Sequence, residues 1–384
     1  MSVHIGGMGW VTPLGCGISE VWERLLAGDE AAPATVESAL DAPSYPAFRV
    51  PAEALAKAPA HPRLRRSSAI SRFAVVAGLA ALEDAGVTLD PASAERTAII
   101  FAISNGGVVY TKRFYHEVVE SGAQAASPLL FPETVFNAPA SHLAAILGIT
   151  GASYTLVGDG TVGVLALKMA EDLMQNPALD RCLVVGAEEA DWLLCDAFRR
   201  WRLSRPALPI EVFRARPRGM ILSEGAGAVL VDRAGSTVIE QIDSGSNFSR
   251  QSDAATCVDT VFQHLGATAN NVIVASANGT FIDTAEKTAV LHHCPAAAVY
   301  APKAALGESV GAGSLWQVIC ATQILRTQQL PPIPHLAPEN EIQVSGSARK
   351  NLGADRVLVS SCGMNQQVAG LSLRRGDSQR LSGV

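Results

Sequence analysis

The feature that most constrains the fold of this chain is an alternation of short apolar runs with helical patterns, which begins near residue 3 and continues almost to the end. The apolar runs indicate buried strands, and the segments between them carry apolar residues at helical spacing. After Ala234-Gly235 the alternation restarts in a shorter form. We therefore predict an α/β fold of two similar halves, residues 1–235 and 236–384, whose helices pack on largely buried sheets. No long flexible linker separates the halves, so we expect them to share one body.

The alternation places most of the expected elements. Strands are expected at residues 3–11, 97–104, 153–157, 182–186, 226–232, 237–243, 272–275, 356–361 and 368–373. Helices are expected from about residue 19 and near 71–86, 107–120, 139–147, 161–175, 252–265, 284–293 and 311–327. Residues 29–60 contain many Ala and Pro with little periodicity, so we expect an irregular surface excursion there.

Composition excludes several classes of protein. The chain has 384 residues, and its 30 Lys and Arg against 36 Asp and Glu give a formal net charge of −6. No long Lys/Arg block occurs, which argues against a nucleic-acid binder, because such affinity comes mainly from neutralising phosphates. The N-terminus lacks a basic region followed by an apolar run, and no window of about 18 uninterrupted apolar residues occurs. We expect a soluble, cytoplasmic protein that does not span a membrane.

The cysteines and histidines give no sign of a metal site. The seven cysteines are odd in number and scattered, without CxxC spacing. We interpret all of them as reduced core thiols: Cys16, Cys182, Cys195, Cys257, Cys294, Cys320 and Cys362. His142 has no second ligand at metal spacing, and His292-His293 ends an expected helix. We therefore predict no metal and no cofactor.

Four glycine-containing or basic segments occur in a defined order. They are IGGMGWVTPLG at 5–15, VGAEEA at 185–190, FRRWRLS at 198–204 and SEGAG at 223–227. Together they resemble the β-ketoacyl-carrier-protein synthases, the condensing enzymes of fatty-acid and polyketide assembly. The resemblance implies the thiolase fold, with two pseudo-duplicated α/β halves and helices between and outside two mainly mixed sheets. It also implies a dimer-contact insertion at about 105–150.

The resemblance further implies where a catalytic centre would lie. In that family a Cys at a strand-to-helix elbow is the nucleophile, and two His residues in the second half assist decarboxylation and condensation. Here Gly160 stands at the Cys position, and the two His motifs carry Asn278 and, five residues after Lys303, Glu308. None of the seven cysteines lies in an elbow motif that could supply the thiol.

Each replacement removes one chemical capability. Gly160 cannot form an acyl-enzyme, and Asn278 can donate a hydrogen bond but cannot transfer a proton. An ionised Glu308 about 4 Å from a malonyl carboxylate would oppose decarboxylation by roughly 4 kcal/mol at an effective dielectric of about 20. Two interpretations of Glu308 stay open: a buried structural carboxylate bonded to Lys303 or to a backbone amide, or a participant in a new reaction. Asp159 is likewise either the N-cap of the following helix or a new acid or base.

Other candidate residues lie around this centre. The resemblance places Phe114, Phe131 and Phe136 along an acyl tunnel, although an ordinary core is the alternative, and it places Met364 where an aromatic residue gates acyl entry. It also implies that two basic clusters face the acidic helix of acyl carrier protein, unless they are surface arginines without partners. These clusters are centred on Arg65, Arg66, Arg72, Arg199 and Arg202.

These residues lead to one main functional prediction. The chain resembles a chain length factor, a degenerate subunit that pairs with an active ketosynthase and shapes the shared tunnel, although such subunits usually carry Gln where this chain has Gly160. We therefore expect a non-catalytic subunit of an acyltransferase complex, a heterodimer with a large apolar interface. Two alternatives remain: a repurposed homodimeric enzyme that acts on acyl thioesters through Asp159, Asn278 or Glu308, and a non-enzymatic carrier-protein scaffold.

Overall fold

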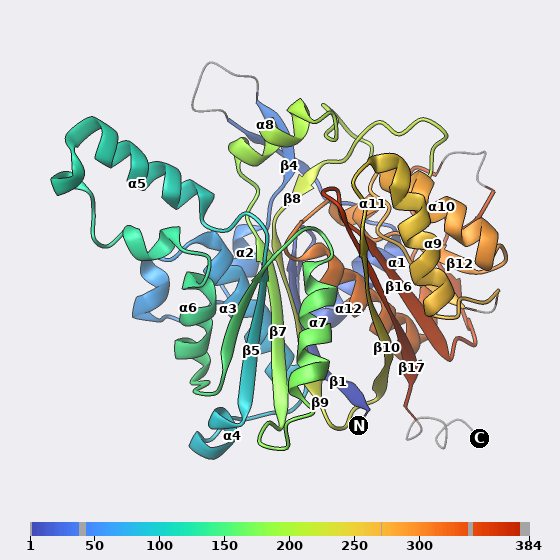
Figure 1. Cartoon of the computed structure of the whole chain (residues 1–384), viewed down its shortest axis with the longest axis horizontal. Coiled ribbons are helices and arrows are strands. Elements are labelled where there is room, and N and C mark those ends of the chain that lie inside the picture. Colours follow the sequence, from blue (N-terminus) through green and yellow to red (C-terminus); the bar gives the residue numbers. More distant parts are fainter. Residues whose placement is uncertain (1, 38–43, 270, 337–340, 377–384) are drawn as a thin grey trace.

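The structure is a computed structural model that describes residues 2–37, 44–269, 271–336 and 341–376. Its main feature is one large mixed sheet that contains two five-stranded units (Figure 1). The first unit consists of β1 (Val3–Thr12), β5 (Thr97–Ile103), β6 (Ser153–Val157), β7 (Arg181–Glu188) and β9 (Gly225–Asp232). The second unit consists of β10 (Thr237–Asn247), β11 (Val272–Val274), β12 (Ala298–Tyr300), β16 (Arg356–Cys362) and β17 (Gln367–Arg375).

The two units have the same strand order and the same strand directions. In the first, β1, β9 and β7 pair antiparallel, and β7, β5 and β6 then pair parallel. In the second, β10, β17 and β16 pair antiparallel, and β16, β11 and β12 then pair parallel. The duplicated architecture predicted from the sequence is therefore present.

The two units are joined through their first strands. β1 and β10 pair antiparallel over Val3–Ile5, so the two sheets that we expected form one continuous sheet of twelve strands. Two short strands complete it, β2 (Gly15–Cys16) beside β1 and β14 (Gln343–Val344) beside β12. A separate two-stranded pair consists of β13 (Gln329–Leu330) and β15 (Arg349–Lys350).

Two helices lie between the strands of the two units. α12 (Gly313–Thr327) is buried from Gly313 to Leu325 and contacts β7 and β9 of the first unit as well as β11 and β16 of the second. α7 (Val162–Leu173) likewise contacts β5 and β7 as well as β10 and β17. These two helices form the apolar centre of the molecule, which explains why α12 has no exposed polar face.

Other helices cover the outer faces of the sheet. α3 (Ala69–Asp84) packs on β1, β7 and β9, and α9 (Ala254–His264) packs on β10, β16 and β17 beside α10 (Phe281–His293). The glycine motif near the N-terminus permits the first contact, because a Cβ at Gly9 would lie 2.1 Å from the carbonyl oxygen of Ala77. The remaining helices are α1 (Ile18–Ala27), α2 (Ala52–Leu55), α4 (Pro91–Glu95), α8 (Trp192–Arg200), α11 (Lys303–Leu306), η1 (Pro62–Arg65) and η4 (Gln251–Asp253).

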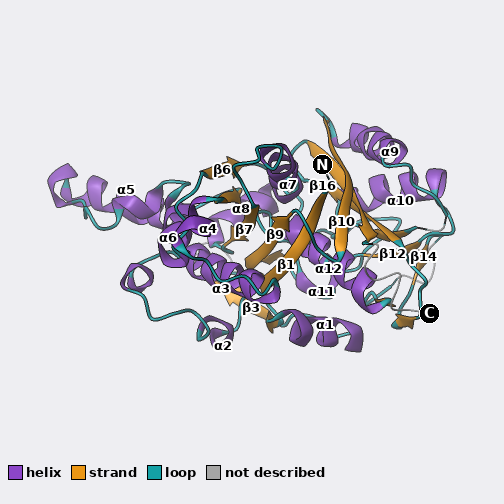
Figure 2. Ribbon diagram, turned by 90° about the horizontal axis from the view of Figure 1, so that it is seen from below, coloured by secondary structure: helices purple, strands orange, loops and turns teal. Residues whose placement is uncertain are grey.

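The expected insertion at 105–150 forms an arm at one end of the molecule. It contains α5 (Val108–Ser121), η2 (Ala123–Ala125), η3 (Phe131–Thr134) and α6 (Ala138–Leu147). No residue of α5 is buried, and the helix projects from the body at the end opposite α9 and α10 (Figure 2). The arm is anchored at its base, where Glu133 accepts a hydrogen bond from the Ser68 N–H and lies 2.6 Å from His142 Nε2.

The expectation of an irregular surface excursion at 29–60 is wrong for the described part of that segment. β3 (Pro33–Val36) and β4 (Tyr45–Phe48) form a hairpin, and β4 pairs in parallel with β8 (Leu222–Ser223). Phe48 is fully buried. These strands show no periodic pattern because they are short and the partner β8 lies far along the chain. Within the described residues, no helix combines the length and apolar character that a membrane span requires.

Candidate active site

The strand-to-helix elbow is formed by the residues between β6 and α7. Gly160 lies in it and is buried. A Cβ built on Gly160 would lie 3.4 Å from the Cα of Gly363 and 4.0 Å from Oε1 of Glu308. Position 160 therefore has space for a small side chain, and that space faces the Glu308 carboxylate.

Glu308 is the centre of a buried polar trio. Its two carboxylate oxygens lie 2.9 and 2.8 Å from Nζ of Lys303, and its Oε2 accepts a hydrogen bond of 2.6 Å from Nδ2 of Asn278. Each of the three residues is 1% exposed. The structure thus joins Asn278 and Glu308, and Glu308 has the contact with Lys303 that the first interpretation predicted.

Neighbouring groups fix the orientation of Asn278. Its Oδ1 accepts hydrogen bonds of 2.6 Å from the Thr280 hydroxyl and 3.1 Å from the Thr280 N–H, so Nδ2 must point to Glu308. The Asn278 N–H donates to Asp283, whose pKa burial raises to about 6 despite the backbone N–H groups that lower it. Sequence reasoning did not select Thr280 or Asp283, because neither resembles a reactive group in isolation.

Asp159 is directed away from the start of α7. The helix begins after Thr161 and has no side-chain cap, whereas the Asp159 carboxylate accepts a 2.7 Å hydrogen bond from the Asn365 N–H. The N-cap interpretation of Asp159 is therefore wrong. The loop after β16 approaches closely because Gly363 lacks a side chain, since a Cβ there would lie 1.9 Å from Asp159 Oδ2.

The environment of Asp159 favours its protonated form. Burial raises the pKa of the carboxyl above its ordinary value, and the negative charge of Glu308 acts in the same direction, against the N–H groups of Gly160 and Asn365. Gln367 supports the elbow by accepting hydrogen bonds from the Asp159 N–H and the Thr161 hydroxyl, both 3.1 Å long. A buried carboxyl of this kind can donate or accept a proton.

A pocket of about 430 Å³ leads from Asp159 to the surface. Trp201, which is 61% exposed, stands on its wall together with Phe198, and the two rings meet edge to face at 5.5 Å between centroids. Other lining residues are Ser104, Asn105, Val157, Gly158, Asn247, Val310, Asn365, Gln366 and Gln367. The elbow is therefore open to a ligand on the Asp159 side, while the Glu308 trio lies in the interior.

The cysteines are poor nucleophiles in this structure. Six of the seven are buried, and Cys257 is half-buried. Cys362 adjoins the site through Gly363, but burial raises the pKa of its thiol well above the ordinary value, and the charges of Glu286 and Asp159 act in the same direction. Because the thiolate is the reactive form, this environment disfavours Cys362 as a nucleophile.

Phe114, Phe131 and Phe136, the candidate tunnel residues, lie on the arm, and Met364 lies in the loop after β16. Phe131 and Phe136 are 55% and 45% exposed, and the Phe114 ring packs on Phe131 at 5.5 Å between centroids. They therefore form no enclosed tunnel in a single chain, because α5 projects from the body. Met364 is buried, on the same loop as Gly363 and Asn365.

The two basic clusters differ in how far they are neutralised. Arg65, Arg66 and Arg72 line a cavity of about 450 Å³ on the arm side of the molecule, together with Arg113. In the second cluster, Arg199 and Arg200 both form ion pairs with Asp196, at 3.1 and 2.6 Å, while Arg202 is exposed. The first cluster thus offers the stronger positive field.

Comparisons with known proteins place this arrangement in context. The family model for the N-terminal domain of beta-ketoacyl synthases matches residues 1–236. The 3-oxoacyl-[acyl-carrier-protein] synthase 2 of Coxiella burnetii is 23% identical over 412 residues, which cover 97% of this chain and 98% of that protein. The tetracenomycin polyketide synthase ketoacyl synthase beta subunit of Streptomyces glaucescens is 25% identical over 404 residues, with 97% and 98% covered.

Solved structures share the whole fold. The ishigamide ketosynthase/chain length factor aligns with a TM-score of 0.85 at 20% identity and covers 98% of this chain and 99% of its own. A ketosynthase in complex with its chain length factor from Xenorhabdus doucetiae aligns with a TM-score of 0.80 at 18% identity, with 98% of each chain covered. The fold is therefore the thiolase fold of the ketosynthases.

Proposed function

Since this chain belongs to the β-ketoacyl synthase family, we propose that it is a non-catalytic, chain-length-factor-like subunit that pairs with an active ketosynthase. The pair would assemble polyketide, polyene or fatty-acid-type chains in the cytoplasm. The observation that carries this proposal is the centre itself, where Gly160 occupies the nucleophile position and faces the closed trio of Glu308, Lys303 and Asn278.

The trio is unsuited to the condensation reaction. Decarboxylation of a malonyl group needs hydrogen-bond donors at the thioester oxygen, where negative charge develops. Here the donors of Lys303 and Asn278 are directed to the Glu308 carboxylate, which also adds negative charge beside Gly160. A chain built in this way needs another subunit to supply the thiol and the histidines.

The surface around β6 supports a partner chain. Among the described strands β6 pairs with β5 alone, and Tyr154 and Val157 on it are 41% and 55% exposed. A cavity of about 630 Å³ lies between α6 and β6. Further exposed apolar side chains are contributed by the arm and its loop, namely Tyr115, Val119, Leu129, Phe131, Val135 and Phe136. An apolar surface of this extent favours an interface, and the aromatic side chains of the arm would reach the tunnel through the partner.

The arginine-lined cavity supports a second, transient partner. Arg65, Arg66, Arg72 and Arg113 face a single lining carboxylate, Glu117, so the cavity carries a net positive charge. An acidic acyl carrier protein would be attracted to it by charge complementarity. The second cluster, neutralised in part by Asp196, would contribute less.

One observation favours a second candidate function. Asp159 is a buried carboxyl with a raised pKa at the floor of an open pocket, which suits a general acid or base. A homodimer could use it for acyl transfer, cyclisation or proton transfer on an acyl thioester.

Intact-protein mass analysis separates these functions. The purified chain is incubated with acyl and malonyl thioesters of acyl carrier protein, and a cysteine-bearing ketosynthase serves as the positive control. We expect no covalent acyl group on this chain and no consumption of either thioester. Turnover that Asp159→Asn abolishes would establish the repurposed enzyme, and an acyl adduct lost in Cys362→Ala would contradict both functions.

A further inference from the structure

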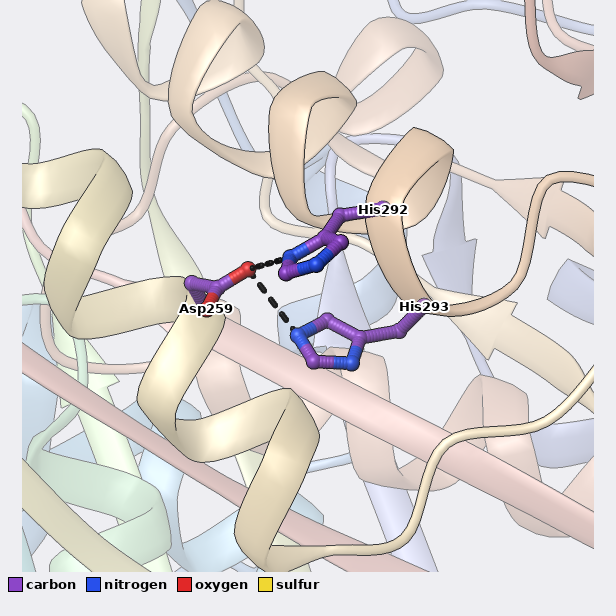
Figure 3. A group of neighbouring side chains, drawn as sticks. All are labelled: Asp259, His292 and His293. Atoms are coloured by element: carbon purple, nitrogen blue, oxygen red, sulfur yellow. Dashed lines mark hydrogen bonds and ion pairs between the residues drawn. The ribbon is translucent and has the colours of Figure 1, made fainter.

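Three side chains with metal-binding atoms converge on the outer face of the second half (Figure 3). Asp259 lies on α9, and His292 and His293 are the last two residues of α10. Oδ1 of Asp259 lies 2.7 Å from Nδ1 of His292 and 2.9 Å from Nε2 of His293. One ligand atom from each residue lies within 4.8 Å of the other two.

The convergence of two neighbouring histidines is unusual for a helix. Successive residues point about 100° apart around the helix axis, so their side chains normally diverge. Here the rings use different nitrogens, Nδ1 of His292 and Nε2 of His293, and their centroids are 4.4 Å apart. Both rings therefore direct a nitrogen to the same carboxylate oxygen, as Figure 3 shows.

We propose that Asp259, His292 and His293 bind a divalent transition-metal ion, with Zn²⁺ the best match. Two imidazole nitrogens and one carboxylate oxygen form a three-ligand set typical of zinc, with a fourth position left for water. Mg²⁺ and Ca²⁺ prefer sites built from oxygen alone, so the histidines select against them.

The distances agree with this assignment. Zinc bonds of about 2.1 Å in a tetrahedron place the ligand atoms about 3.4 Å apart. The observed separations of 2.7 and 2.9 Å therefore need to widen by roughly 0.5 to 0.7 Å, which small side-chain rotations provide. The side chain of His292 is 68% exposed and that of Asp259 31%, so an ion and its water can enter.

Binding would join two helices of the second half. Without an ion, hydrogen bonds to Asp259 connect α10 to α9, and the His293 ring packs beside Phe262 at 6.3 Å between centroids. Sequence spacing predicted no metal, because Asp259 lies 33 residues before His292 and only the packing of α9 on α10 brings them together.

The test uses the full chain without a histidine tag. Zn²⁺ alone is titrated by calorimetry, Co²⁺ is added for its visible spectrum, and Mg²⁺ is the negative control. The variants are Asp259→Asn, His292→Ala and His293→Ala. The matched control is His264→Ala, because His264, also on α9, contacts the carboxylate of Asp243 at 2.7 Å without a second imidazole.

We expect the wild type and His264→Ala to bind one Zn²⁺ with the same affinity, to show a tetrahedral Co²⁺ spectrum without a thiolate charge-transfer band, and to unfold at a higher temperature with the ion. Each of the three site variants should bind at least tenfold more weakly and lose the thermal shift. Circular dichroism verifies that each variant is folded. Zinc binding that the three substitutions leave unchanged, or no binding by the wild type, would overturn the proposal.

Discussion

Lys303 and Glu308 form a fully buried ion pair in the interior of this ketosynthase-like chain, with Nζ 2.8 and 2.9 Å from the two carboxylate oxygens and side chains that are 2% and 1% exposed. In an active condensing enzyme the corresponding region must hold a reacting malonyl group. Here the two charges are directed at each other. Under the proposed function the pair would have a structural role and would exclude substrate from the space beside Gly160.

Removal of one partner should destabilise the protein strongly. Glu308→Ala leaves the Lys303 charge buried without a partner, and we expect a loss of about 3–5 kcal/mol in the free energy of unfolding. Urea unfolding measures this. Lys168→Ala, which breaks the partly exposed surface ion pairs with Glu171 and Asp172, should cost at most about 1 kcal/mol. A loss for Glu308→Ala as small as that of the control would refute the structural function.

A thiol introduced at the elbow should be accommodated but unreactive. In Gly160→Cys the new Cβ lies 3.4 Å or more from its neighbours, so the variant should fold. The Glu308 carboxylate beside it disfavours the thiolate. We expect alkylation by iodoacetamide to be slow, and about tenfold faster in Gly160→Cys/Glu308→Gln, since about 1.4 kcal/mol corresponds to a factor of ten. The wild type gives the background of the native cysteines, and equal rates in both variants would contradict the account.

Stability should fall as the pH rises through the weakly acidic range. Burial raises the pKa of Glu286 from 4.5 to about 7, although the N–H and the hydroxyl of Ser276 donate hydrogen bonds to it. Between these values the folded chain holds a proton that the unfolded chain releases, so the free energy of unfolding decreases with increasing pH. Glu286→Gln should flatten this decrease in urea unfolding measured from pH 4.5 to 7.

Glu240 provides a control residue, because its pKa is shifted in the opposite direction to that of Glu286. Partial burial raises its pKa, but the hydrogen bonds from Arg356 and Ser372 and the charges of Arg356 and Arg374 together outweigh this, and the net shift is downward. The contribution of Glu240 to stability is lost only as the pH falls below the ordinary pKa of a glutamate side chain. Glu240→Gln should therefore leave the slope between pH 4.5 and 7 unchanged, and the same flattening in both variants would rule out Glu286 as the cause.

The exposed edge strand should be required for dimer formation. Val157→Asp puts a charge on β6 without disturbing the core, because Val157 is 55% exposed. We expect the dimer dissociation constant to rise about tenfold or more, or ~1.4 kcal/mol, in analytical ultracentrifugation. Gln263→Asp on α9, at the other end of the molecule, should have no effect, and an intact dimer in Val157→Asp would place the interface elsewhere.

Carrier-protein binding should depend on the less neutralised arginine cluster. Arg65→Glu/Arg66→Glu should slow association with acyl carrier protein and weaken its dependence on salt, because charge steering acts mainly on the association rate. Surface plasmon resonance at two ionic strengths measures both effects. Arg250→Glu, an exposed arginine on the second half, is the control. An equal decrease of the association rate in both variants would indicate a general effect of the protein's charge.

The sequence was sufficient for the fold. Apolar runs predicted the strands of both units, and motif order selected Gly160, Asn278 and Glu308, which the structure brings together. Contacts between distant residues were not accessible in this way. The N-cap rule is local, whereas Asp159 bonds to Asn365, which lies 206 residues later.

Other failures have the same physical origin. The strand containing Phe48 pairs with residues 222–223, and the residue pattern of its own segment does not identify that partner. The candidate tunnel residues on the arm were assigned by resemblance, but an arm that projects from the body can line a tunnel only with a second chain. Packing between elements, and not the pattern within them, determined each of these outcomes.

Native mass spectrometry tests the central claim most directly. The chain is analysed alone and after co-expression with the cysteine-bearing ketosynthases of its own genome, and the product of any complex is then measured. We predict a tight 1:1 heterodimer whose condensing activity survives Gly160→Ala and whose product length changes on substitution of Phe131 or Phe136. A homodimer that forms no complex with any of these ketosynthases and turns over an acyl thioester by itself would contradict the account.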